Sequence, residues 1–430
     1  MRPDQRKLIF LSSLGGVLEF YDFIIYALFA GYIANAFFPA ANALMGLIVT
    51  FATFAIGYLV RPLGGVIFGH YGDRIGRKTT FTFSIFMMAL ATLGIGLIPD
   101  YAAIGIAAPI LVILLRLLQG FSIGGEIPGA IAYVSESLPE KKGYACGVIF
   151  CALTMGIVLG SLVQACVINV FNDVQMQSYG WRIPFVAGGV FGLISYFMRR
   201  ELRESSQFLQ IEKEVEAFPL GAVCREQLAV VVAGIFIIAS CAAIVTSLFL
   251  FIPAYFSKVL DLPATAYIWQ RTAAIAFGSV LCIPFGWLSD KVNLKKLLLT
   301  LNLATCLMAF PIYYIYAHFP AWFSAAFIAS AVLTGFSAGI VPVVISELFP
   351  TRIRYSGIAM SYNLGFAIFG GLTPFFSLSL VYYTGSVISP ALYVFSVAFL
   401  ALMASIWISR RTSSISRLQA DQSSSQVLEC

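Results

Sequence analysis

The sequence predicts an all-α integral membrane protein with twelve transmembrane helices in two pseudo-symmetric six-helix bundles. Three observations support this prediction: an apolar composition, twelve long apolar segments, and motifs that recur about half the chain apart. Hydrophobic residues make up 60% of the 430 residues, charged residues make up 11%, and the mean hydropathy is +0.91. A soluble domain has about 45–50% apolar and about 25% charged residues. The composition therefore excludes a water-soluble globule, a disordered chain and a nucleic-acid binder.

Each apolar segment is long enough to cross a bilayer, which needs roughly 20 helical residues. The apolar residues run continuously and do not alternate with a period of two, so helices are favoured over barrel strands. The N-terminal segment resembles a signal peptide, but Glu19 and Asp22 interrupt it and no A-x-A site follows, so we expect an uncleaved first span. The expected spans are 8–38, 44–69, 79–98, 104–136, 144–172, 181–198, 227–257, 264–289, 297–317, 321–348, 355–383 and 388–409.

The basic residues indicate the orientation of these spans. Of the 26 Lys and Arg residues, 21 lie in termini and connections on one side, and only Arg182 and Lys258 lie in connections on the other. Cytoplasmic connections carry an excess of Lys and Arg. We therefore expect a multi-pass protein of the cell inner (cytoplasmic) membrane with both termini in the cytoplasm. The net charge of +6 then reflects topology and does not indicate an acidic partner.

A charged stretch between the sixth and seventh spans divides the chain. Residues 199–226 are expected to form a cytoplasmic linker helix between two bundles. The predicted domains are accordingly an N-terminal bundle (1–198), a C-terminal bundle (227–409) and a cytoplasmic tail (410–430).

Two motifs recur in both halves. A Ser-Glu-x-x-Pro motif places Glu136 at the end of the fourth span and Glu347 at the end of the tenth. A Gly-x-x-x-Asp motif followed by basic residues places Asp73 after the second span and Asp290 after the eighth. The offsets are 211 and 217 residues, close to half the chain. Internal repeats of this kind suit alternating access around a site near the midplane.

Six segments carry a resemblance to a known family: LEFYDF (18–23), RPLGGVIFGHYGDRIGRK (61–78), RLLQGFSIGGEIPGA (116–130), GWRIPF (180–185), ELFPTRIRYSG (347–357) and YNLGFAIFGGLTP (362–374). They resemble the major facilitator superfamily, and more narrowly the metabolite:proton symporter family of citrate, dicarboxylate, shikimate and proline/betaine carriers. The resemblance implies the major facilitator fold and transport of a small solute. The chain departs from the family in having Asn293 and Leu294 where the family usually has Gly-Arg.

Carboxylates inside the spans are the candidates for proton coupling, because a charge at the midplane costs about 2.5–3.5 kcal/mol. Glu19 and Asp22 share one face of the first span at spacing i, i+3. Two neighbouring carboxylates in low dielectric are not both ionised at low cost. At least one is therefore expected to carry a coupled proton, the alternative being that one neutralises a nearby Arg. Glu126, in a glycine-rich segment, is expected either to relay protons or gate, or to form a salt bridge with Arg61.

Polar residues within the spans are the candidates for substrate binding. Arg116 is expected either to hold a substrate carboxylate through two parallel hydrogen bonds or to pair with Asp22 or Glu19. Arg271 is expected either to extend to the outer interface or to face the cavity, where it would favour multivalent anions. The remaining candidates offer neutral hydrogen bonds: Tyr21, Gln119, Tyr362 and Asn363.

The resemblance implies a gate at the cytoplasmic ends of the spans. Asp73, Arg74 and Arg77 are expected to latch the two halves together in the outward-facing state through a salt-bridge network. The further gating candidates are Arg61, Glu136, Asp290 and Glu347.

The predicted function is proton-coupled symport that imports a small polar metabolite by alternating access. Eight cysteines and two histidines give no metal-ligand spacing, and no G-x-S-x-G elbow or Walker loop is present, so neither an enzyme nor a cofactor is expected. The coupling ion is expected to be H⁺, with Na⁺ as the alternative. The expected partners are the substrate, the proton and the lipid bilayer, without nucleic acid, and the chain is expected to be a monomer.

Two substrate classes remain open at this point. Three cations within the spans favour an organic acid, from mono- to tricarboxylate. The fifth span, with few hydrogen-bonding groups over residues 150–160, suits a zwitterionic osmolyte such as proline or glycine betaine. An uncoupled exchanger or an exporter on the same fold is a more distant alternative.

Overall fold

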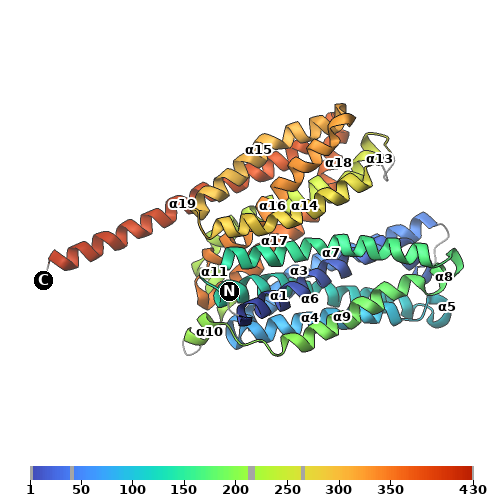
Figure 1. The fold of residues 1–430 in the computed structure, drawn as a ribbon, viewed down its shortest axis with the longest axis horizontal. Helices are drawn as coiled ribbons and strands as arrows, with labels where there is room; N and C mark the ends of the chain where they lie inside the picture. Colours follow the sequence, from blue (N-terminus) through green and yellow to red (C-terminus); the bar gives the residue numbers. More distant parts are fainter. Residues whose placement is uncertain (1–2, 39–42, 212–217, 263–266, 429–430) are drawn as a thin grey trace.

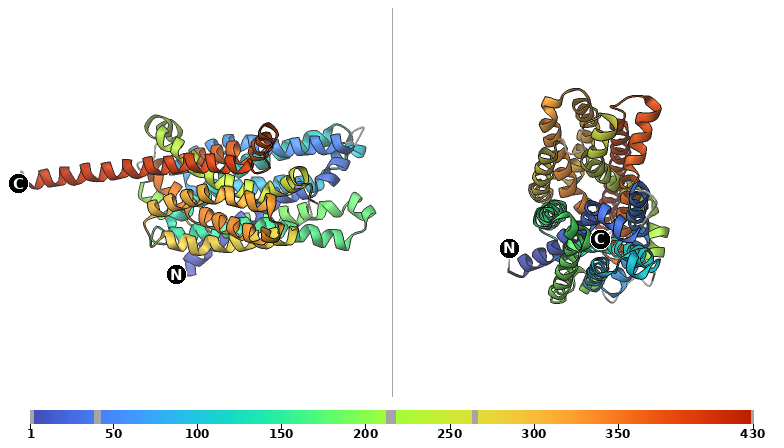
Figure 2. Two further views of the ribbon diagram at one scale, coloured as in Figure 1. Left: turned by 90° about the horizontal axis from the view of Figure 1, so that it is seen from above. Right: turned by 90° about the vertical axis from the view of Figure 1, so that its right-hand side faces the viewer.

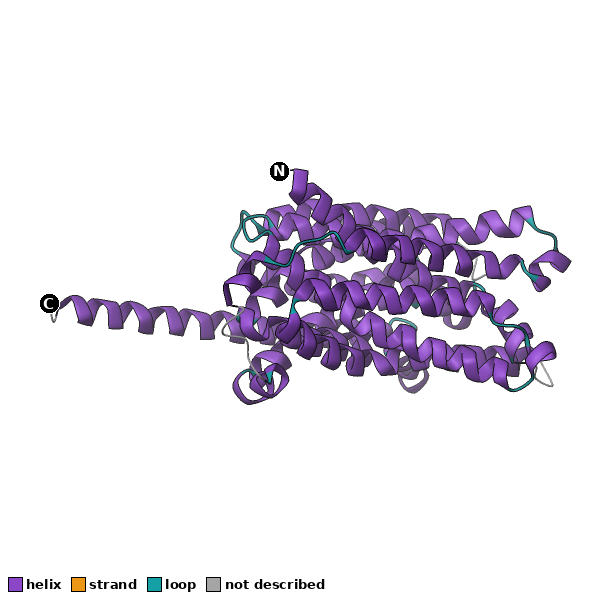
Figure 3. Cartoon of the chain, turned by 90° about the horizontal axis from the view of Figure 1, so that it is seen from below, coloured by secondary structure: helices purple, strands orange, loops and turns teal. Residues whose placement is uncertain are grey.

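The structure is a computed structural model that describes residues 3–38, 43–211, 218–262 and 267–428. The described residues form helices and connecting loops, and none of them lies in a strand (Figure 3). Twelve of the described helices are long and apolar enough to cross a membrane, which confirms the predicted number of spans. The chain folds into two helical bundles, an N-terminal one and a C-terminal one, which the end-on view separates (Figure 2).

The N-terminal bundle contains six long helices and three short ones. A break at Phe29 divides the expected first span into α1 and α2, because one backbone turn departs from helical geometry there. The helices are α1 (Pro3–Leu28), α2 (Ala30–Phe37), α3 (Ala43–Ile75), α4 (Arg77–Leu97), α5 (Tyr101–Ile104), α6 (Ala107–Ser137), α7 (Lys142–Val170), α8 (Asp173–Ser178) and α9 (Ile183–Arg199).

The C-terminal bundle is built on the same plan, but two of its spans are interrupted. A π-helical segment, η3 (Thr246–Leu250), follows α12, and a second one, η6 (Phe366–Gly370), separates α17 from α18. The last helix continues far beyond the bundle (Figure 1). The helices are α12 (Leu228–Val245), α13 (Ile252–Val259), α14 (Ile268–Ser289), α15 (Leu294–His318), α16 (Phe323–Leu348), α17 (Arg354–Gly365), α18 (Thr373–Thr384) and α19 (Pro390–Leu428).

The connection between the bundles differs from the single linker helix that we expected. It contains two short helices, α10 (Ser206–Ile211) and α11 (Pro219–Glu226), and residues 212–217 between them lie outside the described part of the chain. Both helices lie at the end of the molecule from which α19 extends (Figure 1). We call this the proximal end of the bundles and the opposite one the distal end.

The packing of the long helices follows the internal repeat of the sequence, because corresponding helices pair in both bundles. Within the N-terminal bundle α1 packs on α7, α3 on α6 and α4 on α9, and within the C-terminal bundle α12 packs on α17, α14 on α16 and α15 on α19. The most extensive contacts between the bundles are those of α7 with α14 and of α3 with α17, and smaller ones join α7 to α16 and α6 to α17. The bundles touch near the proximal end and diverge toward the distal end, where α8 and α13 lie (Figure 1).

Glycines allow the backbones to approach closely at these contacts. Gly143 and Gly147 of α7 face Gly286 and Cys282 of α14, and a Cβ atom at Gly147 would lie 2.5 Å from the Cys282 carbonyl oxygen. Small residues at i, i+4 permit this close approach of membrane helices. The α7–α14 contact therefore depends on the absence of side chains along one line of α7.

A bulky side chain at Gly147 should separate α7 from α14 at the proximal end. Cys282 is fully buried at this contact, so Gly147→Leu should increase its alkylation by N-ethylmaleimide, measured by mass spectrometry. Gly31→Leu is the matched control, because a Cβ atom there meets no atom within 4 Å. Equal alkylation of Cys282 in both variants would contradict this role of Gly147.

Candidate functional site

A cavity lies between the two bundles, at the middle of the long helices. Three polar residues of the N-terminal bundle line it, namely Glu19 of α1 and Tyr58 and Arg61 of α3. The other lining residues of this bundle are apolar: Phe20, Ile24, Ile123 and Ile157.

The C-terminal wall of the cavity is formed largely by the two π-helical segments. Phe251 donates its N–H to the Thr246 carbonyl at 2.8 Å, and Gly371 donates to that of Phe366 at 2.9 Å, which closes one wide turn in each segment. Such turns occur often at functional sites. Hydrophobic periodicity does not distinguish a π turn from an α turn, so the sequence did not reveal them. The lining residues are Val245, Thr246, Leu250, Phe366 and Gly370.

Glu19 and Arg61 supply the charged groups of the cavity. Glu19 is 1% exposed, and neither oxygen of its carboxyl group has a hydrogen-bond partner among the described residues. Arg61 is 5% exposed, and its guanidinium carbon lies 5.5 Å from the ring centre of Tyr58 and 5.9 Å from that of Phe366. Neither side chain forms an ion pair within the described part of the chain. Arg61, expected as a gating residue, thus lies at the cavity.

Asp22 and Arg116 belong to a separate network inside the N-terminal bundle. The Thr92 hydroxyl donates to Asp22 Oδ2 at 2.7 Å and accepts from Gln119 Nε2 at 2.7 Å, and Arg116 Nη1 donates to Gln119 Oε1 at 2.7 Å. The chain of bonds joins α1, α4 and α6. Asp22 and Arg116 are therefore linked through Thr92 and Gln119, and Arg116 forms no direct ion pair with Asp22 or Glu19 among the described residues.

The structure does not bring this network to the cavity wall. The Arg116 guanidinium carbon lies 4.2 Å from the Tyr26 ring centre and 5.1 Å from that of Phe54, which cover the side chain. Tyr21 turns toward α9, where its hydroxyl donates to the Pro184 carbonyl at 2.9 Å. Glu19 and Asp22 share one helix, but they point to different surroundings because α1 packs against α7 on one side and contacts α4 and α9 on the other.

Glu126 pairs with Arg199 and not with Arg61. Arg199 Nη1 lies 2.7 Å from Glu126 Oε1, and the Ser84 hydroxyl donates to Glu126 Oε2 at 2.6 Å. Arg199 is fully buried and also donates through Nε to the Leu11 carbonyl at 3.1 Å. Sequence reasoning placed Arg199 in the linker, because the last turn of a span and the start of a basic connection look alike in sequence.

The other three binding candidates also lie off the cavity wall. The Tyr362 ring stacks on that of Phe366, with the ring centres 4.7 Å apart. Asn363 Nδ2 donates to the Gly124 carbonyl of the other bundle at 2.8 Å. Arg271 Nη1 donates to the Phe249 carbonyl at 3.5 Å.

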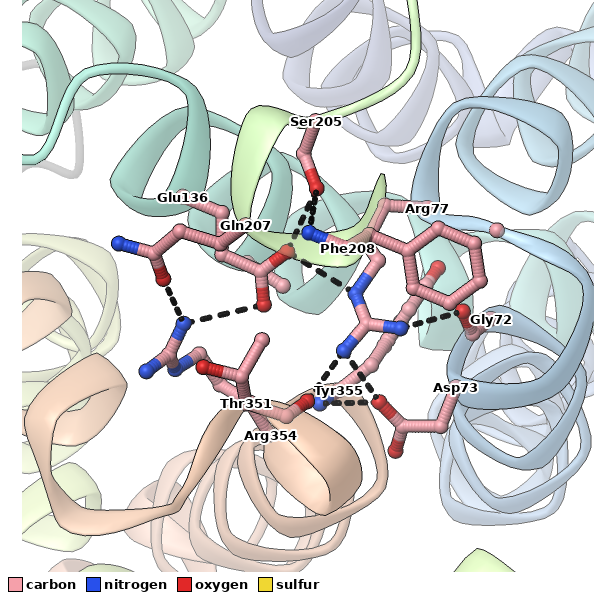
Figure 4. A network of polar contacts seen from close by, with 12 residues as sticks. Gly72, Asp73, Arg77, Glu136, Ser205, Gln207, Phe208, Thr351, Arg354 and Tyr355 are labelled. Atoms are coloured by element: carbon pink, nitrogen blue, oxygen red, sulfur yellow. Dashed lines mark hydrogen bonds and ion pairs between the residues drawn. The ribbon is translucent and has the colours of Figure 1, made fainter. Parts of the chain in front are cut away.

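A buried ion-pair network closes the proximal end (Figure 4). Arg77 lies 3.0 Å from Asp73 through Nη2 and 3.0 Å from Glu136 through Nε. Arg77 also donates to the carbonyl of Thr351 in the other bundle. Arg354 of that bundle lies 3.1 Å from Glu136. The network therefore joins α3, α4 and α6 to the start of α17, and it includes Asp73 and Arg77 of the predicted latch.

Asp73 connects the bundles by capping a helix. Its Oδ1 accepts the Tyr355 N–H at 3.1 Å and its Oδ2 accepts the Ser356 N–H at 2.8 Å (Tyr355 is labelled in Figure 4). Free N–H groups and the helix dipole make an N-terminus favourable for an anion. Arg74, which we expected in the latch, is exposed and forms no ion pair among the described residues.

The second half of the chain contains a corresponding helix-capping contact. Asp290 accepts the N–H groups of Gly143 at 2.7 Å and Tyr144 at 2.8 Å, so it caps α7 of the N-terminal bundle. Glu347 pairs with Lys142 at the protein surface. Leu294 stands 217 residues after Arg77, so this copy has no buried guanidinium at that position.

The linker takes part in the latch, which the sequence did not reveal. Ser205 donates its hydroxyl to Glu136 Oε2 at 2.8 Å, and the Phe208 ring centre lies 4.6 Å from the Arg77 guanidinium carbon. Glu204 accepts the N–H of Arg77 at 3.1 Å and so caps α4. In the sequence, the only signal for this contact with the latch is a Glu and an aromatic residue, Glu204 and Phe208, shortly after the sixth span, and that signal is weak.

Two six-helix bundles around a charged midplane cavity, with one end closed by a latch, define a membrane transporter. A model of the Major Facilitator Superfamily matches residues 12–282. The chain belongs to this superfamily. It is 35% identical over 416 residues to a putative proline/betaine transporter of Staphylococcus aureus (93% of this chain, 87% of the relative). It is 31% identical over 411 residues to a citrate-proton symporter of Klebsiella pneumoniae (93% and 90%).

Solved structures show the same fold. The proton:xylose symporter XylE bound to 6-bromo-6-deoxy-D-glucose matches with a TM-score of 0.76 at 14% identity, over 94% of this chain and 95% of that one. The inward open conformation of the xylose transporter XylE from E. coli matches with a TM-score of 0.63 at 15% identity, over the same shares.

Removal of the latch guanidinium should open the proximal end. Arg77→Ala leaves Asp73 buried without its cation and Glu136 with Arg354 alone, and an unpaired buried charge costs about 3–5 kcal/mol in this conformation. We expect faster alkylation of Cys146 and Cys282, which are buried at the α7–α14 contact. Arg74→Ala is the control and should not change the rate. Unchanged alkylation in Arg77→Ala would remove the latch role.

Loss of Arg199 should destabilise the N-terminal bundle. Arg199→Met leaves the Glu126 carboxylate buried without its cation, so we expect the apparent Tm of the purified protein to fall by several degrees. Adding Glu126→Gln should recover most of the loss, because the unpaired charge is then removed. Arg200→Met, at an exposed position, is the control. An equal Tm for Arg199→Met and Arg200→Met would contradict a structural role for the pair.

Proposed function

We propose that the protein is a proton-coupled symporter that imports a small organic acid by alternating access. The proposal rests on two charged groups in the cavity, the Glu19 carboxyl and the Arg61 guanidinium, neither of which forms an ion pair among the described residues. A buried carboxylate without a hydrogen-bond donor is costly, and so is an unpaired buried cation. A proton on Glu19 and an anion on Arg61 remove both costs together, which links proton binding to substrate binding.

Glu19 carries the proton-coupling role in this proposal, in preference to Asp22 and Glu126. Asp22 accepts a hydrogen bond from Thr92, and Glu126 is ion-paired to Arg199. Each of these carboxylates therefore has a hydrogen-bond or ion-pair partner on at least one oxygen, whereas neither oxygen of Glu19 has a hydrogen-bond partner among the described residues.

We propose that the proximal end faces the cytoplasm of a cell with this chain in its inner membrane. The excess of Lys and Arg on that side supports this orientation. The structure then corresponds to an outward-facing state, with the latch closed toward the cytoplasm. Import requires the latch to open and the distal ends to close around the loaded cavity, and the chain acts as a monomer without cofactor or metal.

The named relatives support symport and leave two substrate classes to compare. One is named a citrate-proton symporter, and the other a putative proline/betaine transporter. The unpaired cation at the cavity favours an organic acid, because an anion compensates it directly. A zwitterionic osmolyte is the second candidate, since its two charges match the opposite charges of Arg61 and an ionised Glu19.

Proton coupling is tested in proteoliposomes that contain pyranine, a fluorescent pH indicator. Organic acids, proline and glycine betaine are added one at a time, and an active compound should acidify the lumen of wild-type liposomes. Glu19→Gln should abolish this proton entry and uphill accumulation while sparing exchange of labelled substrate. Replacing the H⁺ gradient with a Na⁺ gradient tests the alternative ion.

Glu201→Gln is the matched control for Glu19→Gln. Glu201 is exposed outside the spans, and Lys7 donates to it at 2.6 Å, which lowers the pKa of the Glu201 carboxyl. Its removal should leave proton entry unchanged. Full accumulation by Glu19→Gln would end the coupling role of Glu19, and accumulation driven by Na⁺ alone would replace the proton as coupling ion.

A further inference from the structure

The two walls of the cavity differ in chemistry. The C-terminal wall offers no charged side chain among its described residues. Its one hydroxyl, that of Thr246, lies 2.6 Å from the Ala242 carbonyl and 2.7 Å from the Thr373 hydroxyl, so its hydrogen-bonding capacity is largely used within the bundle. A substrate group that touches this wall therefore meets mainly apolar atoms, such as those of Val245 and Leu250.

The N-terminal wall presents a single cation. Arg61 is the one basic residue among the described residues that line the cavity. The other buried guanidiniums are engaged elsewhere, because Arg77 pairs with Asp73 and Glu136, Arg116 bonds to Gln119, and Arg199 pairs with Glu126. The half-buried Arg271 donates to a backbone carbonyl. The cavity can therefore compensate one negative charge on a substrate.

The Arg61 guanidinium is available for such a charge. Its Nε has no hydrogen-bond partner among the described residues, and its two ring contacts leave the edge of the planar group free of any ion pair. A guanidinium edge binds a carboxylate through two parallel hydrogen bonds. One carboxylate satisfies this edge, and a second carboxylate on the same molecule would have no cation to meet.

We propose, resting on the proposed proton symport, that the substrate is a monocarboxylate with a compact apolar body, either branched aliphatic or aromatic. The carboxylate binds Arg61, and the apolar body packs against Ile123 and Ile157 on one side and Val245 and Leu250 on the other.

Charge balance selects this class over the alternatives. With a proton on Glu19, the Arg61 cation and one substrate carboxylate make the loaded cavity neutral. A di- or tricarboxylate would add one or two uncompensated charges in a low-dielectric site. The ammonium group of a zwitterion would need an ionised Glu19, but proton coupling places a proton on Glu19. The rings of Tyr58 and Phe366 do not replace that carboxylate, because they already face the Arg61 cation.

The test compares binding of matched ligands to the purified full-length protein by isothermal titration at mildly acidic pH. The probes are benzoate and isovalerate, the dicarboxylate succinate, the tricarboxylate citrate, the zwitterions proline and glycine betaine, and benzamide as the uncharged match of benzoate. Benzoate or isovalerate should bind at least about tenfold more tightly than each of the others, the factor expected for one unpaired buried polar group.

Variants locate the two ends of the ligand. Arg61→Gln should weaken benzoate binding about tenfold or more through loss of a charge-assisted contact, and Arg271→Gln is the control that should not. Val245→Thr keeps the side-chain shape and should weaken benzoate binding roughly fourfold, the effect of one buried methyl group. Unaltered binding in both Arg61→Gln and Val245→Thr would overturn the assignment. The wild-type ligand series decides the substrate class even if a variant does not fold.

Pyranine liposomes separate failure of this inference from failure of the proposed function. Proton entry driven by citrate or glycine betaine, but by neither monocarboxylate, would leave the symporter standing and overturn the substrate class. Because neutral benzoic and isovaleric acids cross bilayers unaided, proton entry is taken as the excess over protein-free liposomes. Such an excess with none of the probes would refute the proposed function and this inference with it. Proton entry driven by benzoate or isovalerate, and lost in Arg61→Gln, supports both.

Discussion

Carboxylates that cap helices of the opposite bundle hold the two halves together, and the rest of the structure depends on these contacts. Asp73 caps α17 and Asp290 caps α7, so a repeat in the sequence becomes a pseudo-symmetric pair of contacts. A helix N-terminus attracts an anion through its free N–H groups and its dipole. Because Gly143 and Gly147 carry no side chains along the same line, the backbones meet at the proximal end and diverge beyond the cavity.

The remaining buried charges show where function resides. In the described part of the N-terminal bundle, hydrogen bonds through Thr92 and Gln119 link Asp22 to Arg116, and Glu126 pairs directly with Arg199. An unpaired buried charge destabilises a fold by several kcal/mol. Glu19 is the exception at the cavity, together with the cation opposite it. We infer that Glu19 and Arg61 lack partners in this state because a proton and a substrate anion bind to them during the transport cycle.

Sequence reasoning predicted the spans and the repeat, but not the direction in which each charged side chain points. The latch residues Asp73 and Arg77 lie where the motif placed them, because a short turn between two helices fixes their position. Arg116 faces Gly57 of α3, whereas Arg61 faces Gly124 of α6, so the two arginines lie at different depths. The predicted roles favoured Arg116 for the substrate. The structure instead places Arg61 at the cavity, since successive residues of a helix point about 100° apart and helix packing selects the face that meets the cavity.

The sequence by itself determined that this chain crosses a membrane twelve times as two related halves, because apolar length and repeated motifs are local properties of the chain. Only the tertiary structure decided which charges meet. It paired Glu126 with Arg199 across helices far apart in sequence, brought the linker into the latch, and placed two π-helical turns in the cavity wall. Each of these depends on how helices rotate and slide against one another, and side-chain packing in the assembled bundles sets that rotation.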